Sequence, residues 1–458
     1  MKDYQGTSAI KRARIAVIIA AAFLVIALVV FAIAYSLSGV GNEPQSLTKE
    51  DIAAKIDSVR GGESEHNYAA TYLLDFGIRG FDASKFKTAE SFFHGYSIYE
   101  IKPTLELAIE TAELFLEFYY DTVDLADKTE LTDALITCYV EATGDKYAVY
   151  RTREEYENYN ADMSGSFVGI GVYVRYSKDD GTLQVTSVME ESAALEAGIL
   201  AGDYLIAVDG KRLEDIGYES FISSIRGEVG TSVTVTVLRG DVHLELTATR
   251  KQITTKTVSY SIDEEKIGYL QLTGFKENTA EQFCEAIDAL EASGAVGIVF
   301  DLRDNPGGYL TSVIEVIDYL VPKGTRIASY TSVSGETVYT AQSNHCISVP
   351  ITVVFNENTA SAGELFSAAM RDYSELGVLE CRTVGKNTYS KGVMQNTGTF
   401  ADGSTLTLTI AYYNPPCNIN YDGIGVAPDV VAEWGADGDP QLAAAYEEIK
   451  SLINKQSK

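Results

Sequence analysis

The sequence is poor in the residues that most often bind metals. It contains five cysteines and four histidines in 458 residues. No Cys-x-x-Cys pair or other metal-ligand spacing occurs, and no histidine stands beside a carboxylate in a metal-binding motif. We therefore expect free, partly buried thiols and no metal site. The cysteines are Cys138, Cys284, Cys346, Cys381 and Cys417, and the histidines are His66, His94, His243 and His345.

Positive charge is also scarce. Lysine and arginine number 36 against 65 aspartates and glutamates, which gives a formal net charge of −29. Nucleic-acid binding needs a basic surface, so this balance argues against it. The hydrophobic content of 46% and the length are enough for two or three domains with a sizeable core.

One long apolar run is present near the N-terminus. Residues 15–35 carry no charge, and at about 1.5 Å per residue a helix of this length spans a bilayer. Basic residues precede the run and acid-rich sequence follows. We therefore expect a single-pass anchor in the cell membrane, with residues 1–14 cytoplasmic and the rest extracytoplasmic. A cleaved signal peptide ending near Ala32-Ile33-Ala34 is the alternative, but the length of the run favours a retained anchor.

The hydrophobic period changes along the remaining chain. Residues 36–160 are expected to be mainly helical, since apolar residues recur at helical spacing from Leu105 to Tyr119 and from Leu131 to Ala142. Residues 161–253 contain several short strand patterns and two short helices.

An α/β pattern follows in residues 254–437. Gly297–Leu302 and Ile351–Phe355 are apolar enough to be strands buried on both faces. Asp439-Pro440 forms a good N-cap and first turn for a final helix within residues 438–458.

A serine stands where the strand Ile351–Phe355 is expected to give way to a helix. Such a junction exposes the hydroxyl of Ser361 beside unpaired backbone N–H groups, an arrangement that enzymes use for acyl transfer. Ser361 and Glu364 also fit a capping box, which would only begin the helix. The local sequence leaves both interpretations open.

A glycine-rich loop, Asp301–Gly308, links another expected strand to a helix. The pair Gly307-Gly308 would let backbone N–H groups approach a ligand closely, although a turn that simply requires glycine is equally consistent. If Ser361 is a nucleophile, this loop and the N–H of Ala362 would supply an oxyanion site.

A nucleophilic serine needs a base, and no motif places a histidine for this role. Lys391 lies in a nearly uncharged stretch, which permits the desolvation that lowers a lysine pKa. If the stretch is extended, Lys391 and Gln395 share one face and the amide could orient the amine. An ordinary solvated lysine is the alternative.

Gly169-Ile170-Gly171 precedes an expected edge strand. Its N–H groups could hold the terminal carboxylate of a peptide while the strand pairs with the peptide backbone, and Arg226 could add positive charge. Turn geometry would equally explain the glycines, and a helix C-terminal cation would explain Arg226.

In this order the segments resemble the tail-specific, carboxy-terminal processing serine proteases. The resemblance covers about residues 105–432. It departs from the family pattern at Thr359 and Gly363, on either side of the retained Ser361 in the serine-rich turn, and at Ser390, where glycine usually precedes the lysine. Extra residues near Arg371–Leu379 are expected to form a loop away from the site. The matching segments are Gly144–Tyr147, Glu154–Tyr156, Gly165–Gly171, Ala197–Asp203, Ile225–Thr231, Ile267–Leu270, Asp301–Gly308, the Ser361 junction at Thr359–Glu364, Lys391–Gln395 and Gly423–Asp429.

The resemblance implies a multidomain α+β protein. After the transmembrane helix and the helical region it would have a PDZ domain at residues 161–253 and an α/β protease core of the crotonase/Clp type at residues 254–437. Ser361 would be the nucleophile, Lys391 the general base and Gln395 the residue that positions it. One glycine of the Gly307-Gly308 pair and Ala362 would be the oxyanion donors.

The implied activity is a serine endopeptidase that needs no metal or cofactor. Its substrates would be extracytoplasmic proteins with free C-terminal tails, captured through the PDZ domain. An inactive PDZ scaffold that only binds protein C-termini is the first alternative, and a crotonase-like acyl transferase or thioester enzyme is the second. A homo-oligomer is one option that the sequence leaves open.

Overall fold

The computed structural model describes residues 48–60, 69, 81–99, 102, 104–123, 127–177, 180–332, 335–433, 435 and 438–456. The chain divides into two compact units, residues 1–61 and 62–458. Helix α2 (Lys49–Arg60) is the described element of the first unit, and all the elements below belong to the second. Within these ranges no helix combines the length and apolar composition needed to span a membrane. The expected anchor, residues 15–35, lies outside them.

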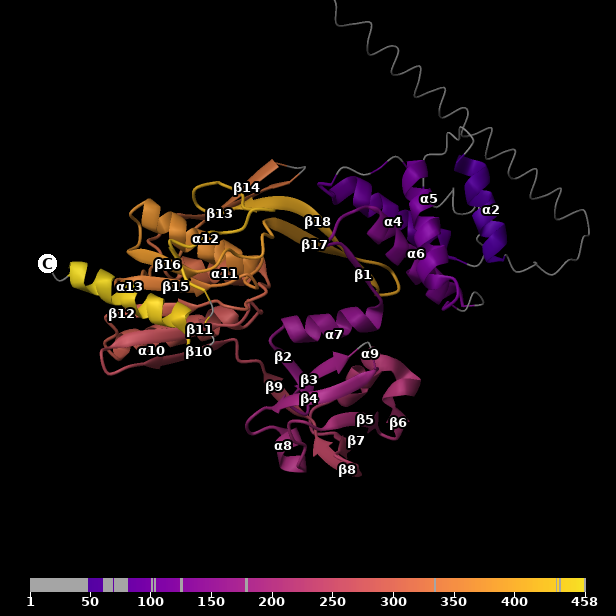
Figure 1. Ribbon diagram of the computed structural model, residues 1–458, viewed down its shortest axis with the longest axis horizontal. Coiled ribbons are helices and arrows are strands. Elements are labelled where there is room, and N and C mark those ends of the chain that lie inside the picture. Colours follow the sequence, from indigo (N-terminus) through magenta and orange to yellow (C-terminus); the bar gives the residue numbers. More distant parts are fainter. Residues whose placement is uncertain are drawn as a thin grey trace, which may run out of the picture. The chain divides into compact units, whose positions relative to one another are not determined.

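The second unit begins with a helical region (Figure 1). Asp82 and Asp127 cap α4 and α6 by accepting hydrogen bonds from first-turn N–H groups. Phe86 and Phe93 of α4 pack edge-on against Tyr139 of α6, with ring centroids 5.3 and 5.5 Å apart. The elements are α4 (Ala83–Tyr96), α5 (Thr104–Leu114), the π-helical turn η1 (Phe115–Tyr119), α6 (Lys128–Ala142), β1 (Val149–Arg151) and α7 (Arg153–Met163).

Strand β1 interrupts the helical pattern expected before residue 160. It pairs antiparallel with β18 (Thr405–Asn414), so Tyr150 lies opposite Leu406. Three residues are too few to show a period, and the partner strand is remote in sequence.

A second group of strands forms an antiparallel sheet in the order β3-β4-β5-β7-β8. Val233, Val235 and Val237 alternate along β7 and pack with Phe221 of α9 in one buried cluster. The short strands β2 and β9 pair antiparallel with each other, one before and one after the strands of this sheet in the chain. Its elements are β2 (Ser166–Gly169), β3 (Val172–Ser177), β4 (Thr182–Val188), α8 (Ala193–Ala197), β5 (Tyr204–Val208), β6 (Lys211–Arg212), α9 (Leu213–Ile225), β7 (Ser232–Arg239), β8 (Val242–Thr249) and β9 (Lys251–Thr254).

The largest buried core surrounds a six-stranded sheet in the order β10-β11-β12-β15-β16-β19. All neighbours are parallel except β10 and β11. Ile298 and Phe300 of β12 face one cluster, which includes α10, α11 and α12, whereas Val299 faces α13 (Figure 1). The bounds are β10 (Val258–Ile262), β11 (Ile267–Leu272), α10 (Thr279–Ala292), β12 (Gly297–Asp301), α11 (Leu310–Asp318), β15 (Ile351–Phe355), α12 (Ala362–Glu375), β16 (Cys381–Gly385), β19 (Val430–Val431) and α13 (Pro440–Gln456).

The parallel arrangement places the functional loops at one edge of this sheet. The carboxyl ends of β12 and β15 lead into the Asp301–Gly308 loop and the Ser361 turn. A separate sheet, β1-β18-β13-β14 with β17 paired to β18, carries the segment that follows Lys391. The bounds not yet given are β13 (Arg326–Ser332), β14 (Gly335–Thr340) and β17 (Val393–Thr399).

The prediction of a loop at Arg371–Leu379 is wrong for the first half of that segment. Arg371 to Glu375 continue helix α12. Tyr373 is fully buried there, and its hydroxyl donates to the carbonyl oxygen of Arg326 at 2.8 Å. This burial favours helix over loop.

Candidate active site

Ser361 lies at the N-cap of α12 in a strained conformation. Its φ of 54° and ψ of −117° place a non-glycine residue in a sparsely populated region. The N–H of Ser361 donates to Glu364 Oε2 at 2.9 Å, and the preceding Ala360 N–H donates to Asn305 O at 2.9 Å. The helix-start interaction therefore occurs at this turn together with a strained, half-buried serine.

The carboxylate of Glu364 joins the Ser361 turn to the Lys391 segment. This side chain is fully buried. Oε2 accepts the N–H of Ser361 and, at 2.8 Å, the N–H of Lys391, while Oε1 accepts the N–H of Ser390 at 2.7 Å and the Thr388 hydroxyl at 2.5 Å. The sequence indicated only the contact within the helix start, because the other donors lie far along the chain.

Ser390 keeps the backbone that a glycine would adopt. Its φ is 84°, in the left-handed region that favours glycine. The bond from its N–H to Glu364 helps to hold that conformation. The departure from the family pattern is thus accommodated with local strain at Ser390.

Lys391 is half-buried and faces an amide and an aromatic ring. Its Nζ donates to Gln395 Oε1 at 2.9 Å and lies 4.6 Å from the centroid of the Tyr147 ring. Burial lowers the pKa of Lys391 below its ordinary value, although the charges of Asp145 and Glu364 oppose this shift. Lys391 is therefore easier to deprotonate than a solvated lysine.

Asp145 fixes Tyr147 beside the lysine. Its buried carboxylate accepts hydrogen bonds from the N–H and hydroxyl of Thr409 at 3.0 and 2.9 Å, and from the N–H of Tyr147 at 3.1 Å. Thr409 pairs with Gln395 across β18 and β17. The Gly144–Tyr147 segment, which the resemblance had marked without a role, thus builds one wall around Lys391.

Tyr413 lies between the two candidate catalytic residues. Its buried hydroxyl is 3.3 Å from Ser361 Oγ and 3.2 Å from the carbonyl oxygen of Lys391. Among the residues that the structure describes, no hydrogen bond joins Ser361 Oγ directly to Lys391 Nζ. The structure brings both segments to one site but leaves these two atoms unbonded.

The two glycines of the loop differ in what their N–H groups can do. The N–H of Gly307 donates to Asn305 Oδ1 at 2.9 Å and is occupied. Within the described ranges no acceptor is assigned to the N–H of Gly308 or of Ala362. A Cβ on Gly307 would lie 2.8 Å from Ala362 N and 2.8 Å from Ser361 Cβ, so this loop packs directly on the serine turn. Gly308 and Ala362 are therefore the available donors.

The four residues expected to bind a peptide line one groove. Gly169, Ile170, Gly171 and Arg226 surround a cavity of about 190 Å³ beside β3 and α9. The guanidinium of Arg226 is not free, since Nη1 donates to the carbonyl oxygen and to Oδ1 of Asn158 in α7 at 3.1 and 2.8 Å.

Comparison with known proteins assigns the two domains. Residues 266–432 match peptidase family S41, and residues 184–239 match the PDZ domain. The chain is 33% identical over 303 residues to a probable CtpA-like serine protease of Staphylococcus haemolyticus, covering 66% of this chain and 60% of that protein. It is 32% identical over 315 residues to the carboxy-terminal processing protease CtpA of Bacillus subtilis, covering 68% of this chain and 66% of that protein.

These matches span somewhat less than two thirds of the curated relatives. Among solved structures, the photosystem II D1 C-terminal processing protease aligns with a TM-score of 0.46 and 22% identity, covering 80% of this chain and 96% of that chain.

Proposed function

Since the chain belongs to peptidase family S41 and carries a PDZ domain, we propose that it is a serine endopeptidase that binds and cleaves the C-terminal tails of extracytoplasmic proteins. The observation that carries this proposal is the carboxylate of Glu364, which accepts the backbone N–H groups of both Ser361 and Lys391. A serine held at a strained helix start and a desolvated lysine are thereby fixed in one site. Acyl transfer requires such a pairing of nucleophile and base.

In the proposed reaction, neutral Lys391 takes the proton of Ser361 as the serine oxygen attacks the peptide carbonyl. The N–H groups of Gly308 and Ala362 stabilise the developing oxyanion. Lys391 then returns the proton to the leaving amine, and water hydrolyses the acyl-enzyme. Gln395 orients the amine throughout. Ser361 Oγ and Lys391 Nζ must approach each other when substrate binds, as catalytic groups often do.

Substrate capture would use the groove of the PDZ domain. A peptide strand added to β3 would place its terminal carboxylate near Gly169–Gly171, with Arg226 at the same groove.

Residues 15–35 would anchor the enzyme in the cell membrane with residues 1–14 in the cytoplasm. Protease treatment of intact cells tests this topology, because digestion that leaves the region beyond residue 36 untouched contradicts it.

Labelling with a fluorophosphonate and a cleavage assay on a protein with an unstructured C-terminal tail test the activity. The wild-type chain should be labelled at Ser361 and should cleave the tail. Ser361→Ala should lose about 10³-fold or more of the activity while unfolding and tail binding stay unchanged. Tail binding without labelling or cleavage would favour the inactive PDZ scaffold. Hydrolysis of acyl thioesters but not of peptides would favour the crotonase-like alternative.

A further inference from the structure

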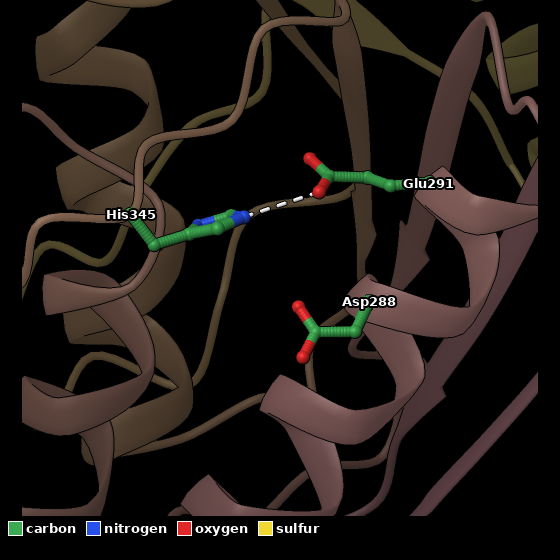
Figure 2. Close-up of side chains that lie close together, drawn as sticks. All are labelled: Asp288, Glu291 and His345. Carbon is green, nitrogen blue, oxygen red and sulfur yellow. Dashed lines mark hydrogen bonds and ion pairs between the residues drawn. The ribbon is translucent and has the colours of Figure 1, made fainter.

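Three side chains with metal-binding atoms converge away from the Ser361 site. Asp288 and Glu291 lie on neighbouring turns of one face of α10, and His345 comes from the connection between β14 and β15 (Figure 2). One ligand atom from each side chain lies within 4.8 Å of the others. His345 Nε2 is 3.2 Å from Glu291 Oε2.

Tyr319 orients two of these three side chains. Its carbonyl oxygen lies 2.6 Å from His345 Nδ1, and its ring stacks on the imidazole with centroids 3.8 Å apart. Its hydroxyl donates to Asp288 Oδ1 at 2.6 Å. A histidine whose second nitrogen is tied to a carbonyl, and a carboxylate held by a hydroxyl, are typical of the outer shell of a metal site.

The hydrogen bond at Nδ1 decides the state of Nε2. A carbonyl oxygen can only accept, so Nδ1 carries the proton and the neutral imidazole presents a lone pair at Nε2. That lone pair faces Glu291 Oε2, which is also an acceptor. Two acceptors at 3.2 Å repel each other unless a proton or a metal cation lies between them.

The loop that carries His345 is held in place independently of the cluster. The carboxylate of Asp318, at the end of α11, accepts the N–H groups of Gln342 and Ser343, the latter at 3.1 Å from each oxygen. The hydroxyl of Ser343 accepts the N–H of His345 at 3.0 Å. The imidazole is thus positioned before any ligand arrives, which lowers the entropic cost of binding.

We propose that Asp288, Glu291 and His345 bind one divalent transition-metal ion, for which Zn²⁺ is the best match. One imidazole nitrogen and two carboxylates suit Zn²⁺, whereas Mg²⁺ and Ca²⁺ prefer oxygen ligands alone. Zinc–ligand bonds of about 2.1 Å put tetrahedral ligands about 3.4 Å apart. The His345–Glu291 pair, at 3.2 Å, is close to that spacing, and the exposed Asp288 side chain, whose ligand atom lies within 4.8 Å of the other two, would turn toward them to complete the set. Water would fill the fourth position.

Such an ion would join α10 to the connection that leads into β15. Both attachment points precede the parallel strands β12 and β15, at the edge of the sheet opposite the Ser361 turn. The ion would therefore stabilise the protease core and take no part in the peptide cleavage proposed above. The site stands whether or not that activity does.

Titration of the full-length, untagged chain in detergent with ZnCl₂, followed by calorimetry and thermal unfolding, tests the proposal. We expect one Zn²⁺ per chain and a rise in Tm on binding. His345→Ala and Glu291→Gln should each weaken binding at least about tenfold, as should Tyr319→Phe, which keeps the stacked ring but loses the bond to Asp288. His243→Ala, an exposed histidine on β8, is the matched control and should bind as the wild type does.

Absence of saturable Zn²⁺ binding overturns the proposal, and so does equal affinity in His345→Ala. A lower Tm for His345→Ala in a protein that takes up no Zn²⁺ would show an imidazolium–carboxylate ion pair instead. Mg²⁺ binding as tightly as Zn²⁺ would also overturn it, since the imidazole would then contribute nothing.

Discussion

Glu364 accepts a hydrogen bond from the backbone N–H of Lys391 at 2.8 Å, although the two residues belong to different segments of the core. The same oxygen accepts the N–H of Ser361. A buried carboxylate at a helix start is favoured by the positive end of the helix dipole. Here it also sets the spacing between the proposed nucleophile and the proposed base, so its role is positional.

Replacing Glu364 with Gln should therefore impair turnover more than binding. The amide keeps the size of the side chain but turns one acceptor into a donor that faces backbone N–H groups. Misplacement of a catalytic group by about 1 Å can cost about 100-fold, so we expect kcat to fall by that order with little change in KM. Glu375→Gln, at the exposed end of the same helix, is the control. A Glu364→Gln enzyme with wild-type kcat would remove the positional role.

The buried Lys391 should produce a characteristic pH dependence. Burial lowers its pKa in the folded state below the unfolded value of 10.5, and the reaction needs the neutral amine. We therefore expect kcat/KM to rise with pH along a limb whose apparent pKa lies below 10.5. The measurement is a pH–rate profile. A limb at the value of an ordinary lysine would contradict the assignment.

The same shift has a consequence for stability. At a pH below the folded-state pKa, Lys391 is protonated in both the folded and the unfolded chain. Burying this charge lowers the free energy of unfolding, because only the folded chain removes the ammonium from water. That cost disappears as the pH rises from the folded to the unfolded pKa. Lys391→Met should therefore raise Tm at neutral pH while lowering activity by about 10²- to 10⁴-fold. Lys386→Met is the control, because Lys386 forms surface ion pairs with Glu357 and Glu433. A lower Tm for Lys391→Met would contradict this argument.

A methyl group at Gly307 should disable the site without unfolding the protein. Its Cβ would lie 2.8 Å from Ser361 Cβ and from Ala362 N, so the serine turn must shift. Gly294→Ala is a matched control, since Gly294 also has a positive φ of 78° but nothing within 4 Å of the new methyl. Gly294→Ala should lose about 1–2 kcal/mol of stability through backbone strain alone, and Gly307→Ala should lose more because its methyl also displaces the serine turn. Only Gly307→Ala should lose peptide cleavage, and retained cleavage would show that the loop is not part of the site.

Local patterns predicted the parts of the site that local geometry builds. The apolar strand before Ser361 and the helical spacing after it predicted the strand–helix junction, and the glycine pair predicted a close backbone approach. Membership of peptidase family S41 and the PDZ domain are confirmed. The anchor at residues 15–35 stays a prediction.

Contacts between distant segments could not be predicted in this way. Asp145 reaches Thr409 across 264 positions, and Glu364 reaches Lys391 across 27. The N–H of Gly307 is occupied by the side chain of Asn305, whereas that of Gly308 is available as a donor, and the glycine pattern alone does not reveal this difference. Likewise His345 meets Glu291 only in the folded chain, 54 positions away, so no metal-binding motif was visible.

Arg226 has two candidate roles, and a peptide-binding experiment separates them. Its guanidinium lines the groove of the PDZ domain but also donates to Asn158 of α7. If Arg226 holds the terminal carboxylate of a tail, Arg226→Ala in the Ser361→Ala background should weaken binding of a free-carboxylate peptide about tenfold, the value of a charge-assisted hydrogen bond. The same peptide with an amidated C-terminus should bind the parent and Arg226→Ala equally. Arg212→Ala, an exposed arginine outside this groove, is the control. Unchanged affinity for the free-carboxylate peptide in Arg226→Ala would mean that Arg226 serves only to hold α7 against the PDZ domain.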